Sequence, residues 1–203
     1  MKIYKGFSNQ ELEHSNPIDL FKDWFEAAKS KELNDPDAMA LATVNSDNFP
    51  NVRMVLLKKI DNGFVFFSNS QSQKGEELNS NSKAALCFHW KSIRKQVRIQ
   101  GDISIIKNQE ADDYFETRSR GSRIGAIISK QSSFLESPEK FEKEYKAYEK
   151  TVEGMEIKRP DYWVGYRLIP TKIEFWLNAE HRLHQRIRFT KDNNKWKKEF
   201  LYP

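Results

Sequence analysis

The chain has 203 residues, of which 34 are Lys or Arg and 29 are Asp or Glu, giving a formal net charge of +5. This length suits one substantial domain, and an aromatic content of 13% is enough to build a core. With 8 Gly and 7 Pro the chain is neither fibrous nor of low complexity, and its single cysteine excludes an internal disulfide. Its mixed charge fits a small anionic ligand at least as well as a nucleic acid.

The sequence contains no signal for a membrane or for secretion. No stretch approaches the roughly 18 consecutive apolar residues of a membrane-spanning helix, and the N-terminus lacks the apolar run of a signal peptide. We therefore expect a cytoplasmic protein that binds no membrane. The one cysteine, Cys87, stands in the apolar run "AALCFHW", which favours a buried role as a small hydrophobic residue.

The first predicted element is a helix over residues 16–31. Asn16 can cap this helix, Pro17 suits its first turn, and apolar residues recur at helical spacing. The pattern then changes to short runs rich in β-branched and aromatic residues, separated by turn-forming residues. Residues 1–34 thus form an N-terminal arm and helix, and residues 35–108 form barrel strands. The strands are expected at 39–45, 52–60, 63–69, 83–90 and 95–106.

A helical region follows over residues 109–153, with helices predicted at 109–118 and 137–152. Strands return over residues 160–203 and complete the barrel. We expect them at 162–170, 172–178, 181–190 and 195–203. Because no repeat or linker divides the chain, we predict a single domain over residues 1–203. Its class is mainly β, of the α+β type, with an antiparallel sheet or barrel and peripheral helices.

The run "AEHRLHQRIR" over residues 179–188 concentrates positive charge near the C-terminus. If it is a strand, a period of two places Arg182, His184, Arg186 and Arg188 on one face. Like charges on one strand face repel each other, so an anionic partner is one explanation. A solvated edge strand is the other, since charges on an edge strand also prevent aggregation.

A second polar cluster lies in "YFETRSRGSR". Tyr114, Arg118 and Ser122 are spaced by four residues, which would place them on one helix face, although Gly121 is expected to end the regular helix. A phenol, a guanidinium and a hydroxyl group together suit a phosphate monoester. The same spacing is also common on solvated helix surfaces.

Further polar groups are spread over the strands and loops. Arg53 and Lys58 stand at the two ends of an apolar strand, Lys74 lies in a polar loop, and Gln96 lies within a strand. The run "SKQSS" at 129–133 adds hydroxyl and amide groups. Together these residues offer two anion-binding clusters and amides that can bond a heterocycle. Histidine spacings typical of metal sites are absent, so we predict no metal site.

Four runs of this sequence resemble, in order and in separation, the pyridoxine/pyridoxamine 5′-phosphate oxidase family: "RMVLLK", "QVRIQG", "YFETRSRGSRIGAIISKQSS" and "IEFW…HRLHQR". The resemblance spans about residues 35–203. It implies an FMN-binding split β-barrel in a homodimer, with FMN at the subunit interface. It also implies oxidation of pyridoxine or pyridoxamine 5′-phosphate to pyridoxal 5′-phosphate, with hydride transfer to flavin N5 and O2 as acceptor giving H2O2.

The resemblance also implies roles for individual residues. Arg182 and His184 would be catalytic and would lie, with Leu183, against the substrate ring. Lys58, Tyr114, Arg118 and Ser122 would hold the substrate phosphate, and Tyr4 would contact the substrate. Asp35 stands where the family has an acidic residue near the substrate. The residues implied to bind FMN are Arg53, Met54, Val55, Leu56, Leu57, Lys58, Phe67, Ser68, Gln73, Lys74, Gln96, Gln131, Ser132, Trp176 and Arg186.

The sequence departs from the family pattern at several positions. Gln73 replaces a basic residue, Leu177 replaces a small or polar one, and Gln185 replaces an acidic one. The N-terminus also lacks an Arg that often belongs to a substrate lid. Because these changes spare the catalytic and phosphate residues, we expect activity to be retained.

Two other kinds of function are compatible with parts of this pattern. One is a flavin reductase or another split-barrel oxidoreductase with a different substrate. The other is a non-enzymatic binder of nucleic acid or of pyridoxal phosphate. A nucleic-acid binder would show an affinity that falls steeply with salt, and the mixed overall charge argues against it.

Overall fold

A computed structural model describes residues 6–203. Six α-helices lie along this part of the chain, and a 3-10 turn, η1 (Glu180–Arg182), follows the long strand near the C-terminus. Capping side chains begin most of the helices; Asn16 and Pro17 do so for α2 as predicted. The helices are α1 (Asn9–Glu13), α2 (Pro17–Lys29), α3 (Gln73–Ser80), α4 (Asn108–Thr117), α5 (Arg120–Ile128) and α6 (Pro138–Thr151).

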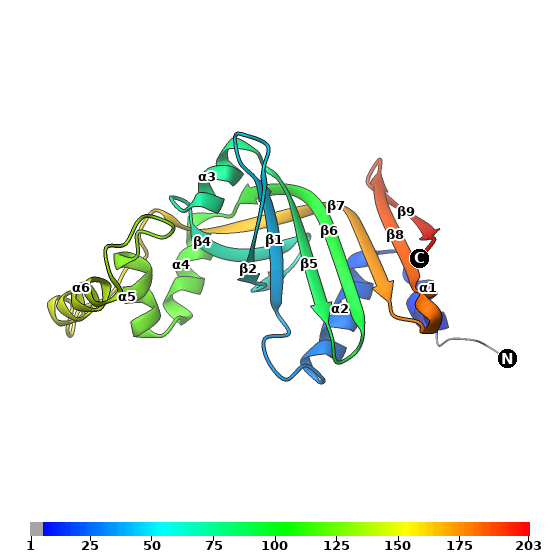
Figure 1. Ribbon diagram of the computed structural model, residues 1–203, viewed down its shortest axis with the longest axis horizontal. Coiled ribbons are helices and arrows are strands. Elements are labelled where there is room, and N and C mark those ends of the chain that lie inside the picture. Colours follow the sequence, from blue (N-terminus) through cyan, green and yellow to red (C-terminus); the bar gives the residue numbers. More distant parts are fainter. Residues whose placement is uncertain (1–5) are drawn as a thin grey trace.

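The described strands form one antiparallel sheet of nine, in the order β2-β1-β5-β6-β7-β4-β3, with β8 and β9 added through β7. Figure 1 shows the sheet curling around the centre of the molecule, with α2 on one side and α4 to α6 at one end. The strands are β1 (Ala38–Val44), β2 (Pro50–Leu56), β3 (Lys59–Ile60), β4 (Phe64–Asn69), β5 (Lys83–Trp90), β6 (Lys95–Ile105), β7 (Trp163–Leu177), β8 (Gln185–Asp192) and β9 (Lys195–Leu201).

The long strand β7 joins the two ends of the molecule. One of its edges pairs with β6, while the other pairs first with β4 and then with β8. The β6–β7 register shifts between Gln100 and Gly101. A Cβ on Gly101 would lie 2.0 Å from the backbone oxygen of Ile169, so only glycine fits this close approach. The strand therefore bends here without breaking.

The core lies between α2 and the concave side of the sheet. Phe21 of α2 packs edge-on against Phe64 and Phe88, with ring centroids 4.8 Å and 5.0 Å away, and Trp24 packs in the same way on Phe175. A smaller cluster around Phe115 joins α4, α5 and the start of β7. Burial of these aromatic side chains holds the helices on the sheet.

The predicted fold class is confirmed, but four local predictions are wrong. The two runs at 162–170 and 172–178 form a single strand, because the chain passes Pro170 without leaving the sheet. The run at 52–60 divides into β2 and β3. The polar segment that begins at residue 70 leads into α3, which is capped by Ser72. Cys87 is half-buried, and burial raises the pKa of its thiol.

Along residues 6–203, none of the helices has the length and apolar character needed to cross a lipid bilayer.

Candidate functional site

A pocket of about 620 Å³ lies between β2, β4, α3, α4 and α5. Its volume is within the range typical of small-molecule sites. Eleven of the residues predicted to form the site line it, and they come from segments that are far apart in the sequence. These residues are Met54, Val55, Leu56, Lys58, Phe67, Ser68, Lys74, Tyr114, Arg118, Ser122 and Gln131.

The proposed phosphate cluster is assembled at the junction of two helices. Tyr114 lies in α4 and Ser122 lies in α5, while Arg118 is the extended residue that ends α4. The prediction that Gly121 ends the helix is wrong, because the break falls at Arg118 and Gly121 lies within α5. All three predicted side chains nevertheless line the same pocket.

Aromatic rings fix one wall of this cluster. The Phe67 ring stacks on Tyr114 at 4.1 Å and on Trp163 at 5.0 Å, with interplanar angles of 11° and 8°. The guanidinium of Arg118 lies 4.9 Å from the centroid of Trp163, close enough for a cation–π interaction. Three parallel rings thus hold the phenol and the guanidinium at the pocket.

The charge of Arg118 is not compensated. Its Nη1 is buried and has no hydrogen-bond partner among residues 6–203. Burial lowers the pKa of this guanidinium, opposed by Tyr114. A buried cationic donor without an acceptor is costly unless a ligand satisfies it, so this position is suited to an anion.

A second cation lies at the other side of the pocket. The ammonium of Lys74 is buried and donates to Gln131 Oε1 at 2.6 Å and to Ser72 Oγ at 2.8 Å. Ser68 Oγ also donates to Gln131 Oε1, at 3.3 Å. Burial, aided by the charge of Arg53, lowers the pKa of Lys74 to about 8. The ammonium thus bonds neutral oxygens beside the N-terminus of α3, which also favours an anion.

The segment after Arg53 contributes one side of the pocket. Met54, Val55 and Leu56 line it, whereas Leu57 is buried in the core. Lys58 lies beyond the end of β2, lines the pocket and forms an ion pair with Asp37 at 2.8 Å.

Several other predicted residues do not line the pocket. Arg53 forms an ion pair with Glu77 of α3 at 3.2 Å, and Gln73 also bonds Glu77. Ser132 has a left-handed φ of 71° and lines a neighbouring hollow. Asp35 precedes β1. Tyr4 lies outside the described residues.

The remaining predicted residues form a second group, the strand-end group, at the far end of β7. Trp176 lies opposite Gln96 on β6 and opposite Arg186 on β8. The His184 ring lies 4.6 Å from that of Trp176, and its Nδ1 accepts a bond from the Ala179 amide, so the neutral ring carries its proton on Nε2. The strand-end group consists of Gln96, Trp176, Arg182, Leu183, His184 and Arg186.

The prediction that four cationic residues share one strand face is wrong. β8 begins only at Gln185, so Arg186 and Arg188 share one face of it, while Arg182 and His184 precede the strand. His181 and Arg182 have φ of 54° and 58°, a strained conformation for residues other than glycine. This turn leaves the Arg182 side chain exposed.

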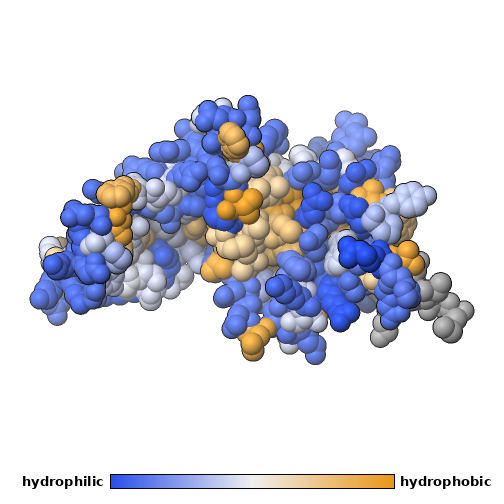
Figure 2. All heavy atoms as spheres, viewed as in Figure 1, coloured by the Kyte–Doolittle hydropathy of each residue, from blue (hydrophilic) through white to orange (hydrophobic). Residues whose placement is uncertain are grey.

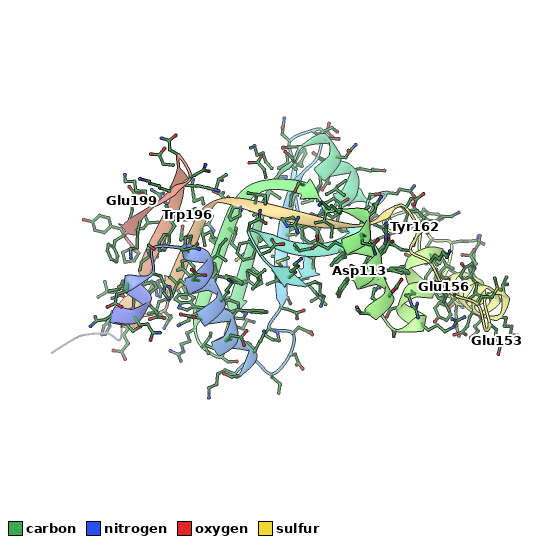
Figure 3. All side chains as sticks on the ribbon, turned by 180° about the vertical axis from the view of Figure 1, so that it is seen from behind. Asp113, Glu153, Glu156, Tyr162, Trp196 and Glu199 are labelled. Carbon is green, nitrogen blue, oxygen red and sulfur yellow. The ribbon has the colours of Figure 1, made fainter. Side chains whose placement is uncertain are left out.

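The pocket and the strand-end group lie at opposite ends of β7. Trp163 begins the strand at the pocket, and Trp176 lies near its other end. At about 3.3 Å per residue, the stretch between them is roughly 40 Å long. Figure 3 shows the same separation: Tyr162, which precedes β7, lies at one end of the molecule, and Trp196 of β9 lies at the other. One chain therefore does not bring the two groups together.

The sequence patterns missed four residues that line the pocket. Trp163 is the most informative, because it contacts Phe67 and Arg118. Trp163 begins a strand after a charged loop, and no spacing pattern in the sequence marks it. An isolated Trp can nevertheless hold a cation over its ring. The four residues are Asn69, Gly125, Ala126 and Trp163, whereas Ser129, which also lines the pocket, belongs to the run "SKQSS" noted above.

Comparison with protein-family models gives two matches. Residues 25–156 match the model described as pyridoxamine 5′-phosphate oxidase, and residues 163–203 match the pyridoxine 5′-phosphate oxidase C-terminal dimerisation region. The chain belongs to the pyridoxamine 5′-phosphate oxidase family. The family is one of oxidoreductases, and the second match supports a homodimer.

Curated relatives in this family are similar over nearly their whole length. A pyridoxine/pyridoxamine 5′-phosphate oxidase of Pelagibacter ubique is 47% identical over 98% of this chain and 97% of its own length. The enzyme of that name from Rhizobium leguminosarum bv. trifolii is 52% identical over 97% of each chain.

Solved structures support the same fold. PhzG from Burkholderia lata 383, in complex with tetrahydrophenazine-1-carboxylic acid, superposes with a TM-score of 0.92 at 31% identity, covering 99% of this chain and 100% of its own. A pyridoxamine 5′-phosphate oxidase-related, FMN-binding protein of Nostoc punctiforme has a TM-score of 0.74 at 14% identity, covering 98% and 100%. The second likeness shows the fold alone.

Proposed function

We propose that this protein is an FMN-dependent oxidase that converts pyridoxamine 5′-phosphate and pyridoxine 5′-phosphate to pyridoxal 5′-phosphate, with O2 as acceptor. The observation that carries the proposal is the pair of cations at one pocket, the buried Lys74 and the half-buried Arg118, whose Nη1 is buried without a partner. Both lie beside aromatic or amide groups that suit a heterocycle. Relatives of this chain carry the corresponding enzyme name.

The donors around Lys74 fit the phosphate and side chain of FMN. Lys74 supplies a buried ammonium, Ser68 a hydroxyl group, and the N-terminus of α3 the positive end of a helix dipole. Met54 and Leu56 offer apolar surface to a flavin ring, and the amide of Gln131 offers polar contacts. FMN fits this part of the pocket because its phosphate would compensate the buried ammonium.

The donors around Arg118 fit the phosphate of the substrate. Arg118 would use its unsatisfied Nη1, while Tyr114, Ser122 and Lys58 would add a phenol, a hydroxyl group and an ammonium. A phosphate monoester matches this mixture of charge and short donors better than a single carboxylate does. The substrate phosphate and the FMN phosphate would thus occupy opposite sides of one pocket.

A second copy of the chain would complete the site. The pocket lacks Arg182, His184 and Trp176, which lie at the far end of β7. On β2, the outward side chains Val52 and Met54 are 66% and 63% exposed. Figure 2 shows apolar residues over the central strands, where Figure 1 draws β1 and β2. This surface, beside the pocket, suits a partner that brings in its own strand-end group.

The chemistry would depend on both groups of residues. When bound, FMN would supply the hydride acceptor at N5, and the two electrons taken from the substrate would then pass from the reduced flavin to O2, giving H2O2. The phosphate cluster would hold the substrate, while Arg182 of the partner copy would lie against the pyridine ring and orient C4′. His184 would hold a proton at Nε2 beside the ring, because Nδ1 is engaged by the Ala179 amide.

The direct test is turnover by the FMN-loaded protein in air. We expect pyridoxamine 5′-phosphate to yield pyridoxal 5′-phosphate and peroxide in equal amounts. Arg182→Ala should lower kcat about 100-fold while FMN stays bound, because positioning is lost. Arg188→Ala is the matched control on the same hairpin and should keep wild-type turnover. A protein that binds no FMN, or forms no aldehyde, contradicts the proposal.

The similarity to PhzG makes a second function testable. That protein was solved with tetrahydrophenazine-1-carboxylic acid, a fused-ring carboxylic acid. An oxidase for such a substrate would need one anion-binding group and a wide apolar slot, and it would leave part of the phosphate cluster unused. Parallel kcat/KM measurements with both substrates decide between the two functions. We expect a preference for the phosphate ester that Arg118→Met removes.

A further inference from the structure

Glu77 is a buried carboxylate for which the proposed chemistry has no direct use. Its side chain is only 5% exposed, and it lies in α3 behind the pocket. Burial raises the pKa of Glu77, but bonds from Thr43, Asn51 and Gln73 and the charge of Arg53 outweigh this effect, so its pKa lies below the ordinary value. The carboxylate is therefore ionised and fully engaged.

The bonds of Glu77 fix the position of Arg53. Arg53 Nη2 donates to Glu77 Oε2 at 3.2 Å, and Arg53 Nη1 donates to Thr43 Oγ1, which in turn donates to the same carboxylate. Nη1 also reaches the Leu41 backbone oxygen at 3.3 Å. Within residues 6–203, Arg53 Nε donates to no acceptor, so it is available to a further acceptor.

Glu77 also balances the charge beside Lys74. Arg53 lies close enough to lower the pKa of the Lys74 ammonium, and Glu77 acts in the opposite direction. Gln73, one turn before Glu77 on α3, donates to its Oε1 at 3.0 Å. Gln73 is neutral at a position where the resemblance places a basic residue, so Arg53 and Lys74 are the cations beside Glu77. Glu77 accepts a bond from Arg53, and its charge raises the pKa of Lys74.

We propose that Glu77 is a positioning residue for the cofactor phosphate, which holds Arg53 in place and allows Arg53 and Lys74 to remain charged side by side. The proposal rests on the proposed function, because it assigns the anion beside Lys74 to FMN. If Glu77 only maintained the shape of the pocket, its loss would weaken the binding of any flavin. If Glu77 positions Arg53 for the phosphate, its loss weakens only the binding of a flavin that carries a phosphate.

Riboflavin separates these two roles, because it has the ring and side chain of FMN without the phosphate. Affinities of the FMN-stripped protein for both flavins are measured by quenching of flavin fluorescence. For Glu77→Gln we expect the preference for FMN over riboflavin to fall about tenfold, while the affinity for riboflavin is unchanged. Glu76→Gln, the same change at the exposed neighbouring residue of α3, should keep the wild-type preference.

A second variant covers the case in which Glu77→Gln does not fold. Thr43→Val removes the hydroxyl group that joins Arg53 to Glu77 and conserves its volume, so it should lower the FMN preference in the same direction by a smaller factor. Equal weakening of both flavins, or an unchanged or larger FMN preference, overturns the role of Glu77. A wild-type protein without any preference for FMN overturns the proposed function itself.

Discussion

One arginine of the pocket, Arg118, and one of the strand-end group, Arg186, are held in opposite ways. At the pocket, Arg118 has a buried Nη1 with no acceptor in the described part of the chain, and Lys74, at the other side of the pocket, bonds neutral oxygens. At the strand end, Arg186 donates through Nε and Nη2 to Glu174 at 2.9 Å and 2.8 Å, and through Nη1 to the Tyr202 backbone oxygen.

Arg118 thus lacks a partner for one of its nitrogens until a ligand binds, whereas Arg186 is already paired within the chain. A buried cation without an acceptor costs folding free energy that a bound anion can recover. A guanidinium held on both edges contributes a rigid surface and little net attraction for an anion. We infer that the pocket supplies affinity for phosphate, whereas the strand-end group supplies orientation.

The largest expected effect comes from separating the two regions. Val52→Asp places a charge on the exposed apolar stripe of β2 without altering a pocket-lining residue. We expect a folded monomer with no oxidase activity, because burying an unpaired carboxylate at the interface is costly. Sedimentation or light scattering measures the mass. Lys146→Asp, on the exposed α6, is the matched control, and an active Val52→Asp dimer would show that this stripe is not the interface.

Two arginine substitutions sharpen the comparison. Arg118→Met should raise KM for the phosphate substrate roughly 10- to 100-fold, through loss of charge-assisted bonds. It should leave the FMN-free protein as stable as wild type, or more stable by up to about 1 kcal/mol, because an unsatisfied buried donor is removed.

Arg186→Met should instead destabilise the protein by about 1–3 kcal/mol, because Glu174, whose side chain is only 12% exposed, loses its main partner. Denaturant unfolding measures both variants in the same buffer. If Arg118→Met and Arg186→Met lost the same free energy of unfolding, the claim that Arg118 is unpaired in the ligand-free protein and Arg186 is paired would be wrong.

A smaller effect concerns pH and Lys74. The pKa of Lys74 is lowered from 10.5 to about 8 in the folded protein. Between pH 8 and pH 10.5 the unfolded chain therefore binds more protons than the folded chain does. The stability of the FMN-free protein should therefore gain from Lys74 as the pH rises from 8 to 10.5, whereas below pH 8 the cost of its burial is fully present.

This gain is at most of the order of 3 kcal/mol. Unfolding of wild type and Lys74→Met at several pH values isolates it from other titrating groups. The variant should be more stable than wild type below pH 8, and the difference should shrink as the pH rises. A constant difference between the two proteins would contradict the lowered pKa.

Much of the fold was predictable from the sequence because strand and helix periods record burial. The alternation of the buried Ile187 and Phe189 with polar residues in β8 and the capped apolar face of α2 are examples. The α3 helix was not predictable in this way, because "QKGEELNS" has no apolar stripe; its cap, Ser72, was the only local signal. The two ends of β7 were read as separate strands because Pro170 usually interrupts a sheet.

The candidate site was only partly predictable. The residue types around Tyr114 and Lys74 indicated anion binding, and the resemblance supplied the identity of the ligands. Periodicity misled at Arg182, because a strained turn replaces the expected strand. Trp163 was missed because its contacts with Phe67 and Arg118 depend on tertiary packing.

The most direct test of the account is a mixed dimer. In a twofold-symmetric dimer whose sites each combine the pocket of one copy with the strand-end group of the other, pairing an Arg118→Ala subunit with an Arg182→Ala subunit leaves one site intact. Differently tagged subunits allow this heterodimer to be purified. At a substrate concentration well below the wild-type KM, where each homodimer is nearly inactive, we predict about half of wild-type turnover. A heterodimer as inactive as its two parents would contradict a site shared between two copies.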